Sequence, residues 1–543
     1  MDGVVDISEL PASTRRRTLS FYVVLLTLVL PLWSAPPLAW AFVIYSLHTG
    51  KIWSYAFRGR IAFALALIEV FFSVYHVQLA RQIAPPTTAG PGDALEIKTA
   101  YVRLLKTGLA NLPVDGGDEE SLVVNRPGSP EESIVQLEKH DLRAIEFRNS
   151  LRNWFRLAPW SSIRALEVRK WLYWSMFNAD MPSSEQMPSL HKEALEDALA
   201  LLQKRTGTNF PEGSNPHTTP LRLTIDPTFV CWRPITFYAI IGLVNRWLRR
   251  RYVSNFGATL QRHGNLEYLL RVPRGWDRRH GPRPLVFVHG LGLGLLQYHI
   301  LISKLFRIFT DRPILIPLQP QISQDFFHPQ FLVPVTRHQM ADNLARVLDK
   351  LGWAYLDTDG DQELDTDSDE EREKVNRDLL QERRGITMLS HSNGTYVHAW
   401  MLKAYPNMLA RSCFVDPVTF CQWEGDVCYK FMYRPAMTGF ELLMRYFVGS
   451  ELGVANLLQR HFDWVSNTLW FEEIPNARDP SKSRFFLGGK DDILNAERIK
   501  KYLISHGVRK GLWYDPQGRH GQALLKGTTG HEEIFRWLQE PDS

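Results

Sequence analysis

The sequence predicts an α/β fold for residues 266–543, in which helices flank a mainly parallel sheet and a helical lid covers it. From Glu267 onward, short β-branched or aromatic runs alternate with helical stretches, which is typical of βαβ units. A serine at position 392 lies in a sharp turn between a strand pattern and a helix pattern. Far from this domain, 29 residues without a formal charge begin at Leu19 and predict a membrane-anchoring region in residues 1–82. Residues 83–265 are expected to be a linker and a mainly helical region.

The composition limits the classes of function. The chain of 543 residues is too long for one compact domain, and 45% hydrophobic with 22% charged residues excludes a wholly disordered or coiled-coil protein. Four cysteines are too few for a disulfide framework and lack the paired spacing of a zinc site. The basic clusters Arg15–Arg17 and Arg246–Arg251 lie beside apolar stretches, which suits anionic lipid headgroups better than a nucleic-acid groove. We therefore expect a lipid bilayer as a partner and no nucleic acid.

The uncharged run Leu19–Leu47 exceeds the roughly 20 residues that cross a bilayer. A possible signal-peptide cleavage site at Trp33–Ala35 is followed at once by Pro36 and Pro37, which is a poor context for cleavage. We therefore expect the segment to be retained. Prolines in the middle of the run allow either one kinked span or a hairpin of two short helices. Arg15–Arg17 and Lys51–Arg60 flank the run, and the positive-inside rule favours the hairpin because it would place both clusters on one side.

Two further apolar runs are candidates for membrane contact. Ile61–Leu79 contains Glu69, whose carboxylate is costly at mid-depth unless it faces protein or is protonated, so this run is either a second span or an interfacial helix. The run Pro234–Val244 is too short to span a bilayer and continues into arginines. It predicts either a buried helix or, over residues 234–248, an interfacial helix whose arginines meet lipid headgroups.

The elements of the α/β domain follow in order along the chain. Pro284–His289 predicts a buried strand that runs into the glycine-rich turn Gly290–Gly294. Further strands are expected at residues 313–317, 385–389, 413–415, 484–487 and 511–514. After Leu389 comes the sequence Ser-His-Ser-Asn-Gly, followed at once by a helix-compatible stretch. This order predicts a strand, a sharp turn and a helix, with a serine at the turn.

The turn Ser390–Gly394 resembles the nucleophile elbow of the α/β-hydrolase superfamily, in which small residues flank the nucleophile. The resemblance covers residues 267–538 and implies an α/β-hydrolase fold of the serine hydrolase, lipase or esterase type, with Ser392 as the nucleophile. Ser390 departs from the family's glycine but is also small. The resemblance implies Asp491 as the acid and His520 as the base, because each follows a predicted strand in the family's order.

Alternatives exist for the acid. Asp416 follows the strand at residues 413–415, where some lipases carry their acid, and Asp492 is the neighbour of the first candidate. His391 should point away from the nucleophile along the turn, so we expect it to pack or hydrogen-bond locally. His531 lies in a predicted helix and is expected to be structural.

The resemblance also implies an oxyanion hole formed by the backbone N–H groups of Leu291 and Asn393.

The turn Gly290–Gly294 does not match the dinucleotide-binding fingerprint, and no Lys-Ser/Thr pair follows it, so we expect no nucleotide. The acidic run at residues 357–373 lacks EF-hand spacing and predicts a solvated, disordered insert; we expect no metal ion and no cofactor. Aromatic residues at about 417–482 predict a lid that suits an apolar acyl or sterol-like substrate, or a lid core that merely covers the sheet.

These patterns predict a membrane-associated serine hydrolase that cleaves an ester of a lipid or another apolar alcohol through an acyl-enzyme. Two other functions stay open: an acyltransferase with the same triad, and a non-catalytic membrane scaffold. The expected location is an endomembrane such as the endoplasmic reticulum or a lipid droplet. The one glycosylation sequon, Asn393–Thr395, lies in the predicted elbow, which is compatible with a cytosolic catalytic face.

Overall fold

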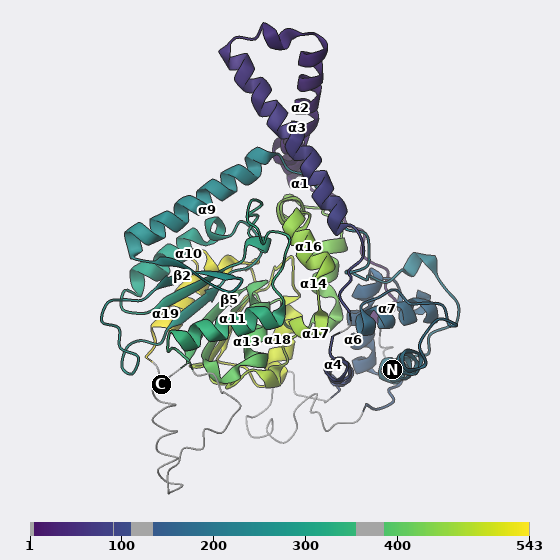
Figure 1. The fold of residues 1–543 in the computed structure, drawn as a ribbon. Coiled ribbons are helices and arrows are strands. Elements are labelled where there is room, and N and C mark those ends of the chain that lie inside the picture. Colours follow the sequence, from purple (N-terminus) through teal and green to yellow (C-terminus); the bar gives the residue numbers. More distant parts are fainter. Residues whose placement is uncertain (1–4, 91, 110–133, 355–384, 542–543) are drawn as a thin grey trace.

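The computed structural model describes residues 5–90, 92–109, 134–354 and 385–541. An α/β body forms the centre, a smaller helical region lies beside it, and a helical hairpin projects from the top (Figure 1). The acidic insert expected at residues 357–373 lies outside the described residues.

Eight strands form one sheet in the order β1-β2-β4-β3-β5-β6-β7-β8. The strands β1 and β2, and β2 and β4, pair antiparallel, and the remaining neighbours pair parallel. The strands are β1 (Thr259–His263), β2 (Leu266–Arg271), β3 (Leu285–Val288), β4 (Ile314–Leu318), β5 (Ile386–His391), β6 (Leu409–Val415), β7 (Ser483–Gly488) and β8 (Leu512–Asp515). The sheet begins at Thr259, so β1 lies before the boundary predicted at residue 266.

Alternate side chains of the central strands enter two different cores, as expected for a parallel sheet covered on both faces. On one face, Val286 and Val288 join a core with α11 (Arg337–Lys350), α13 (Gly394–Ala404) and α18 (Ala496–Ser505). On the other face, Leu285 and Phe287 join a core with α9 (Ile235–Phe256), α10 (Leu295–Ile308) and α19 (Thr529–Gln539). All four strand residues have no exposed surface, so β3 is central to both cores.

The helical region contains α4 (Ala94–Lys106), α6 (Leu142–Leu151), α7 (Ala165–Phe177) and α8 (Ser189–Thr206). The N-terminal turn Ile7–Glu9 is attached to it through buried arginines. Arg148 has no exposed surface and forms an ion pair with Asp6 at 2.6 Å. Arg152 donates to the backbone oxygens of the same turn. Residues 6–10 therefore lie on this region, and the chain then leaves it for the hairpin and returns to it at α4.

The first apolar run is one continuous helix from Leu19 to His48, made of α1 (Leu19–Val24), a π turn (Leu25–Val29) and α2 (Leu30–His48). The predicted hairpin of two short helices inside this run is therefore wrong. Pro37 has no N–H to donate to the carbonyl of Trp33, four residues back, and the indole N–H of Trp232 donates to that oxygen instead, at 3.3 Å. An outside donor thus replaces a bond that the proline removes.

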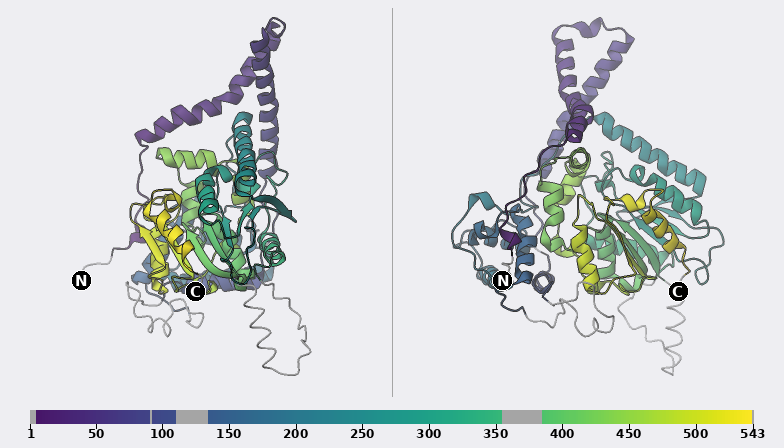
Figure 2. Two further views of the ribbon diagram at one scale, coloured as in Figure 1. Left: turned by 90° about the vertical axis from the view of Figure 1, so that its left-hand side faces the viewer. Right: turned by 180° about the vertical axis from the view of Figure 1, so that it is seen from behind.

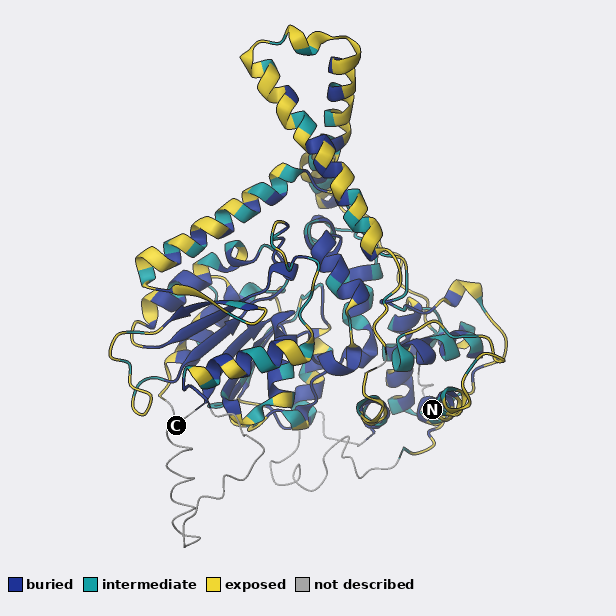
Figure 3. Ribbon diagram, viewed as in Figure 1, coloured by how far each residue is buried: buried dark blue, intermediate teal, exposed yellow. Residues whose placement is uncertain are grey.

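The hairpin forms between this helix and α3 (Phe57–Ile83), and both helices are long and apolar enough to cross a membrane. Trp40 Nε1 donates to Ser73 Oγ at 2.9 Å where the helices meet. The first helix has 30 residues, which corresponds to roughly 45 Å at about 1.5 Å per residue. Arg15–Arg17 and Lys51 therefore lie at opposite ends of one helix, contrary to the expectation of one side. The outer surface of the hairpin is largely exposed (Figure 3).

Glu69 of α3 faces protein. The sequence predicted that its carboxylate would be costly in a membrane unless it faced protein or was protonated, and the first of these conditions is met. Its side chain is buried, and Oε2 accepts from the backbone N–H of Ile235 at 2.9 Å. Ile235 begins α9 (Ile235–Phe256), a helix of 22 residues that extends well beyond the predicted 234–248. One face of α9 is buried through Tyr238, Ile241 and Leu248, whereas the other face is exposed (Figure 3). The helix is thus half buried, between the two predicted alternatives.

The segment between β6 and β7 contains α14 (Asp426–Cys428), α15 (Gly439–Leu443), α16 (Leu452–Arg460) and α17 (Trp464–Asn467). This lid is bonded to the start of the hairpin: Thr18 N–H donates to Met437 O at 2.9 Å, and Gly439 N–H donates to Ser20 Oγ at 3.1 Å. In the left view of Figure 2, the purple hairpin helix comes down over the light green lid. A Cβ at Gly439 would lie 2.6 Å from Ser20 O, so this close approach requires glycine. We call this the α1–lid contact.

Candidate active site

Ser392 lies in the turn between β5 and α13, with a φ of 51° that L side chains rarely adopt. Gly394 allows the turn to pack against β3, because a Cβ there would lie 2.5 Å from the oxygen of Val288. Ser390, which replaces the glycine of the resembled motif, is fully buried, and its Oγ is 2.8 Å from His398 Nδ1. Burial lowers the pKa of His398 to about 3, so this ring is neutral. The serine at this position thus has a buried hydrogen-bond partner of its own.

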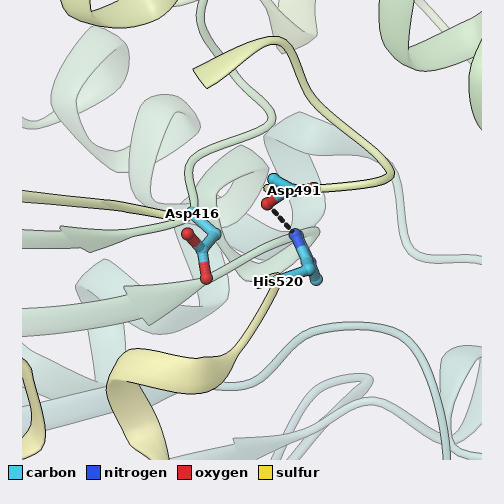
Figure 4. Close-up of side chains that lie close together, drawn as sticks. All are labelled: Asp416, Asp491 and His520. Atoms are coloured by element: carbon cyan, nitrogen blue, oxygen red, sulfur yellow. Dashed lines mark hydrogen bonds and ion pairs between the residues drawn. The ribbon is translucent and has the colours of Figure 1, made fainter. Parts of the chain in front are cut away.

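His520 connects Ser392 to Asp491. His520 Nε2 is 2.8 Å from Ser392 Oγ, and His520 Nδ1 is 2.6 Å from Asp491 Oδ2. The Asp491 side chain has no exposed surface, and its Oδ1 accepts from the backbone N–H groups of Ile493 and Leu494 at 2.7 and 3.1 Å. Figure 4 shows the contact between Asp491 and His520, which come from the loops after β7 and β8. An imidazole between a hydroxyl and a carboxylate can take the hydroxyl proton.

The electrostatic surroundings favour the charged form of this imidazole. Burial alone would lower the pKa of His520, but the carboxylates of Asp491, Asp416 and Asp492 outweigh it and raise the pKa to about 9. These carboxylates would therefore stabilise the positive charge that the His520 ring carries after it accepts a proton.

Asp416, the first alternative acid, directly follows β6 and has a φ of 42°. Its Oδ1 accepts from Gly488 N–H at 3.2 Å, and its Oδ2 accepts from Gly521 N–H at 2.6 Å. Burial raises the pKa of this carboxyl, and nearby Asp491 raises it further. Because Gly488 precedes the loop with Asp491 and Gly521 follows His520, Asp416 ties together the two loops of the site. The carboxylate within hydrogen-bond distance of His520 Nδ1 is that of Asp491.

Asp416, Asp491 and His520 have ligand-type atoms within 4.8 Å of one another, which is a spacing that a metal ion could use. The arrangement favours a hydrogen-bonded set instead. Both oxygens of Asp416 accept from backbone N–H groups, and the nearest nitrogen of His520 is bonded to Asp491. Asp492, the second alternative acid, is half buried and acts on His520 through its charge.

His391 points away from Ser392, as its place in the turn predicts. Its Nδ1 is 2.7 Å from Tyr298 Oη, and burial lowers its pKa well below the usual range. Tyr298 Oη also accepts from Gly290 N–H at 3.0 Å and so fixes the start of the glycine loop beside the site. Sequence reasoning missed Tyr298, because a tyrosine inside a helix pattern carries no signal for such a contact.

Ser392 and His520 line a cavity of about 200 Å³ together with Leu291 and Asn393, the two residues expected at the oxyanion hole. In the described part of the chain, the backbone N–H groups of Leu291 and Asn393 have no protein acceptor. The remaining lining is mainly apolar and comes from the segment before α9, from the lid and from the loop after β7: Leu223, Val427, Phe431, Met432, Phe440, Met444, Leu458, Phe462 and Ile493. Free donors and a buried hydroxyl therefore meet at the base of an apolar cavity.

No protein-family model matches the chain, and no curated protein matches it. Similar solved structures include an α/β hydrolase from a sediment metagenome of the Mar Chica lagoon, with 14% identity, a TM-score of 0.29 and coverage of 51% of this chain and 96% of that one. Another is a bacterial membrane phospholipase A described as a virulence factor, with 13% identity, a TM-score of 0.31 and coverage of 55% and 90%. A third is a carboxylesterase from Bacillus subtilis, with 11% identity, a TM-score of 0.32 and coverage of 56% and 100%.

The fold itself is defined by this chain's own elements. The parallel strands β3 to β8 are covered by helices on both faces, and the turn with Ser392 directly follows β5, as the resemblance to the elbow implies. From Thr259 to the last described residues, the chain has the α/β-hydrolase fold.

Proposed function

We propose that the protein is a membrane-associated serine hydrolase that cleaves the ester bond of a lipid or another apolar substrate. The observation that carries this proposal is the position of His520, which is 2.8 Å from the hydroxyl of Ser392 and 2.6 Å from the carboxylate of Asp491. A serine hydroxyl becomes a useful nucleophile when an oriented imidazole takes its proton.

In the proposed reaction, Ser392 Oγ attacks the ester carbonyl while its proton moves to His520 Nε2. The buried Asp491 holds the ring and stabilises its positive charge. The oxyanion accepts from the free N–H groups of Leu291 and Asn393. The C–O bond to the alcohol then breaks, and the alcohol takes the proton from His520. Water, activated by the same ring, hydrolyses the acyl-enzyme and restores Ser392.

The apolar lining of the 200 Å³ cavity supports an apolar acyl group. Membrane association is supported by the two helices Leu19–His48 and Phe57–Ile83, whose outer side chains include exposed Leu26, Leu38 and Ile44. Such a surface is unfavourable in water and matches the interior of a bilayer. A lipid ester would thus be available where the protein is anchored.

A fluorophosphonate probe tests the nucleophile without a guess about the substrate. We expect the detergent-extracted wild type to be labelled, and Ser392→Ala and His520→Ala to lose labelling. Ser390→Gly is the matched serine control: it restores the glycine of the resembled motif and should keep its labelling. Asp492→Asn is the matched control for the acid and should keep its labelling. Asp491→Asn should lose most of its labelling.

Labelling that persists in Ser392→Ala would overturn the assignment of the nucleophile. A folded wild type that stays unlabelled in both detergent and lipid bilayers would refute the hydrolase proposal and favour a scaffold. Measuring both conditions separates a closed lid from an inactive serine.

A further inference from the structure

The expected oxyanion donor Leu291 lies in a short loop whose other N–H groups are all used. Within the described residues, three of the four N–H groups at positions 290–293 donate to protein: Gly290 to Tyr298 Oη at 3.0 Å, Gly292 to Ile322 O at 3.0 Å, and Leu293 to Gln297 Oε1 at 3.1 Å. The loop is therefore held on both sides of the one N–H group that it leaves for an oxyanion.

Tyr298 limits how this loop can lie against the nucleophile. It belongs to α10, is 5% exposed, and packs edge to face against Phe287 of β3, with ring centroids 5.6 Å apart. A Cβ at Gly290 would lie 2.9 Å from Ser392 Cβ and 3.0 Å from Tyr298 Oη. The backbone of Gly290 thus fills the space between Ser392 and the phenol. Tyr298 does not itself line the cavity of Ser392, so any effect on a substrate there passes through the residues that it bonds.

The same phenol oxygen also bonds to the nucleophile turn. His391 Nδ1 is 2.7 Å from Tyr298 Oη, and burial raises the pKa of Tyr298, so the phenol keeps its proton. The oxygen already accepts from Gly290 N–H and, at 3.5 Å, from Gln297 Nε2. Its O–H is therefore left to donate to His391 Nδ1.

The other nitrogen of the His391 ring faces a carboxylate. With Nδ1 as an acceptor, the proton of this neutral ring is on Nε2. That atom has no hydrogen-bond partner within the described residues and lies 3.9 Å from Asp416 Oδ2. Attraction between this N–H and the carboxylate orients the ring and so supports its bond to Tyr298.

One phenol oxygen thus joins the two segments that carry the expected oxyanion donors. Leu291 directly follows Gly290, and Asn393 comes two residues after His391. These segments lie at the ends of β3 and β5, which are parallel neighbours in the sheet. Strand pairing fixes where the two strands end, but the distance between donors beyond those ends depends on contacts between the loops. Tyr298 supplies such a contact.

We propose that Tyr298 is a positioning residue for the oxyanion hole. Its hydroxyl bonds to Gly290 and to His391 at once, and so holds the two N–H donors that follow them at the spacing that an oxyanion requires. Charge on the oxyanion develops only as Ser392 attacks, so donors held in place stabilise the transition state more than the bound ester. This inference rests on the proposed hydrolase function.

Fluorophosphonate probes with a P=O group and with a P=S group test this role. With both probes, Ser392 Oγ attacks phosphorus, fluoride leaves, and the hydroxyl proton goes to His520. Sulfur is a weaker hydrogen-bond acceptor than oxygen, so the ratio of the P=O to the P=S labelling rate constant reports on the oxyanion hole.

In Tyr298→Phe, which removes only the phenol oxygen, the rate constant with the P=O probe should fall about tenfold, less than the roughly 10²-fold or greater loss that follows removal of a whole donor. The rate constant with the P=S probe should stay within about twofold of the wild type, since sulfur gains little from the donors. The ratio therefore falls, whereas general damage to the site would lower both rate constants together.

Tyr502→Phe is the matched control. Tyr502 is 4% exposed, its Oη accepts from the backbone N–H of Phe471 at 3.0 Å, and it does not line the cavity of Ser392. The variant removes the same kind of buried bond outside the site, so the ratio of the two rate constants should stay unchanged.

His391 tests the other end of the link. His391→Leu removes the acceptor of the phenol proton and should lower the ratio, whereas His391→Asn keeps an acceptor close to the place of Nδ1 and should restore part of it. Because Tyr298 and His391 act through one bond, the double variant Tyr298→Phe with His391→Leu should lose little more than either single variant. The His391 pair also decides the question if Tyr298→Phe does not fold.

An unchanged ratio in folded Tyr298→Phe, including equal falls with both probes, would overturn the positioning role. An equal fall of the ratio in Tyr502→Phe would overturn it as well. Absence of labelling of the wild type by the P=O probe would instead refute the hydrolase proposal itself, so the two failures are distinguishable.

Discussion

At the residue scale, three carboxylates control the proton affinity of His520. Burial works against the charged ring, but Asp491, Asp416 and Asp492 together raise its pKa to about 9. A general base acts in its neutral form, so a raised pKa means that activity increases as the pH rises toward that value.

We therefore expect kcat/KM to increase with pH up to about 9, the value to which the pKa of His520 is raised. Asp492→Asn removes one negative charge that raises this pKa, so the inflection should move to lower pH with the maximal rate largely kept. A pH profile of both proteins with a short-chain ester measures the shift.

Asp491→Asn gives the contrasting result. Because Asp491 is bonded to Nδ1 of His520, its loss should lower the maximal rate by about 10⁴-fold, as for triads in general, rather than move the inflection alone. The opposite result would contradict this assignment: Asp491→Asn would only move the inflection of the pH profile, and Asp492→Asn would lose most of the maximal rate. Asp492 would then be the residue that orients His520, and Asp491 would act through its charge alone.

The sequence placed Ser392, Asp491 and His520 each just after a predicted strand, and the structure brings these side chains into hydrogen-bond contact. Order along the chain carries that information, because the carboxyl ends of parallel strands share one edge of a sheet. The sequence left Asp416 as an alternative acid, since two aspartates after neighbouring strands look the same. The hydrogen bonds that distinguish them run to backbone groups of Gly488 and Gly521, which no side-chain pattern encodes.

At the scale of elements, the continuous helix through Pro36 and Pro37 is the alternative, one span, that the positive-inside rule disfavoured. A proline in the sequence predicts a break in a helix, because it has no N–H to donate to the carbonyl four residues before it. The local sequence does not show that a distant residue can donate to that carbonyl instead. Here Trp232, about 200 residues away in sequence, bonds to the oxygen that Pro37 leaves free. The length of α9 was underestimated for a related reason: its second half is polar on one face and is kept helical by Leu248 and Tyr252 in the core.

The α1–lid contact predicts that the lid responds to changes in the hairpin. Gly439→Ala places a methyl group 2.6 Å from Ser20 O, and overpacking of this kind costs about 1–3 kcal/mol. Since Phe440 and Met444 next to it line the cavity of Ser392, we expect about a tenfold loss of activity on a bilayer-borne ester. Turnover of a soluble short-chain ester should change much less.

Gly449→Ala is the matched control in the same lid, because the nearest atom to its added Cβ is 3.5 Å away, an ordinary contact. Equal losses in both variants, or equal losses on both substrates, would argue against coupling through this contact.

At the scale of the whole molecule, the body meets the hairpin through α9, whose N-terminus receives the carboxylate of Glu69. The exposed face of α9 carries Ile240, Leu243 and Trp247 together with Arg246 and Arg250. In Figure 1 this helix slopes up to the base of the hairpin. Apolar side chains mixed with arginines are typical of helices that lie at a lipid surface.

Replacing both Arg246 and Arg250 by glutamate should lower activity in anionic nanodiscs by roughly tenfold or more, because each arginine near an anionic surface contributes about 1 kcal/mol. Activity in neutral nanodiscs should be nearly unchanged, and high salt should reduce the difference. Lys98→Glu with Lys192→Glu makes the same change in net charge on the helical region and serves as the control. Equal effects of the two double variants would contradict a lipid-facing α9.

The attachment of the chain's first residues to the helical region affects how the protein can be produced. A shortened version that starts after the hairpin would lack Asp6 and leave the guanidinium of Arg148, which has no exposed surface, without its carboxylate. Removing one partner of a buried ion pair destabilises a protein by about 3–5 kcal/mol. The same truncation uncovers the lid at Gly439 and removes the acceptor at the start of α9. Deleting the hairpin for solubility would therefore yield an unstable protein, and expression of the full chain with detergent or lipid is the better route.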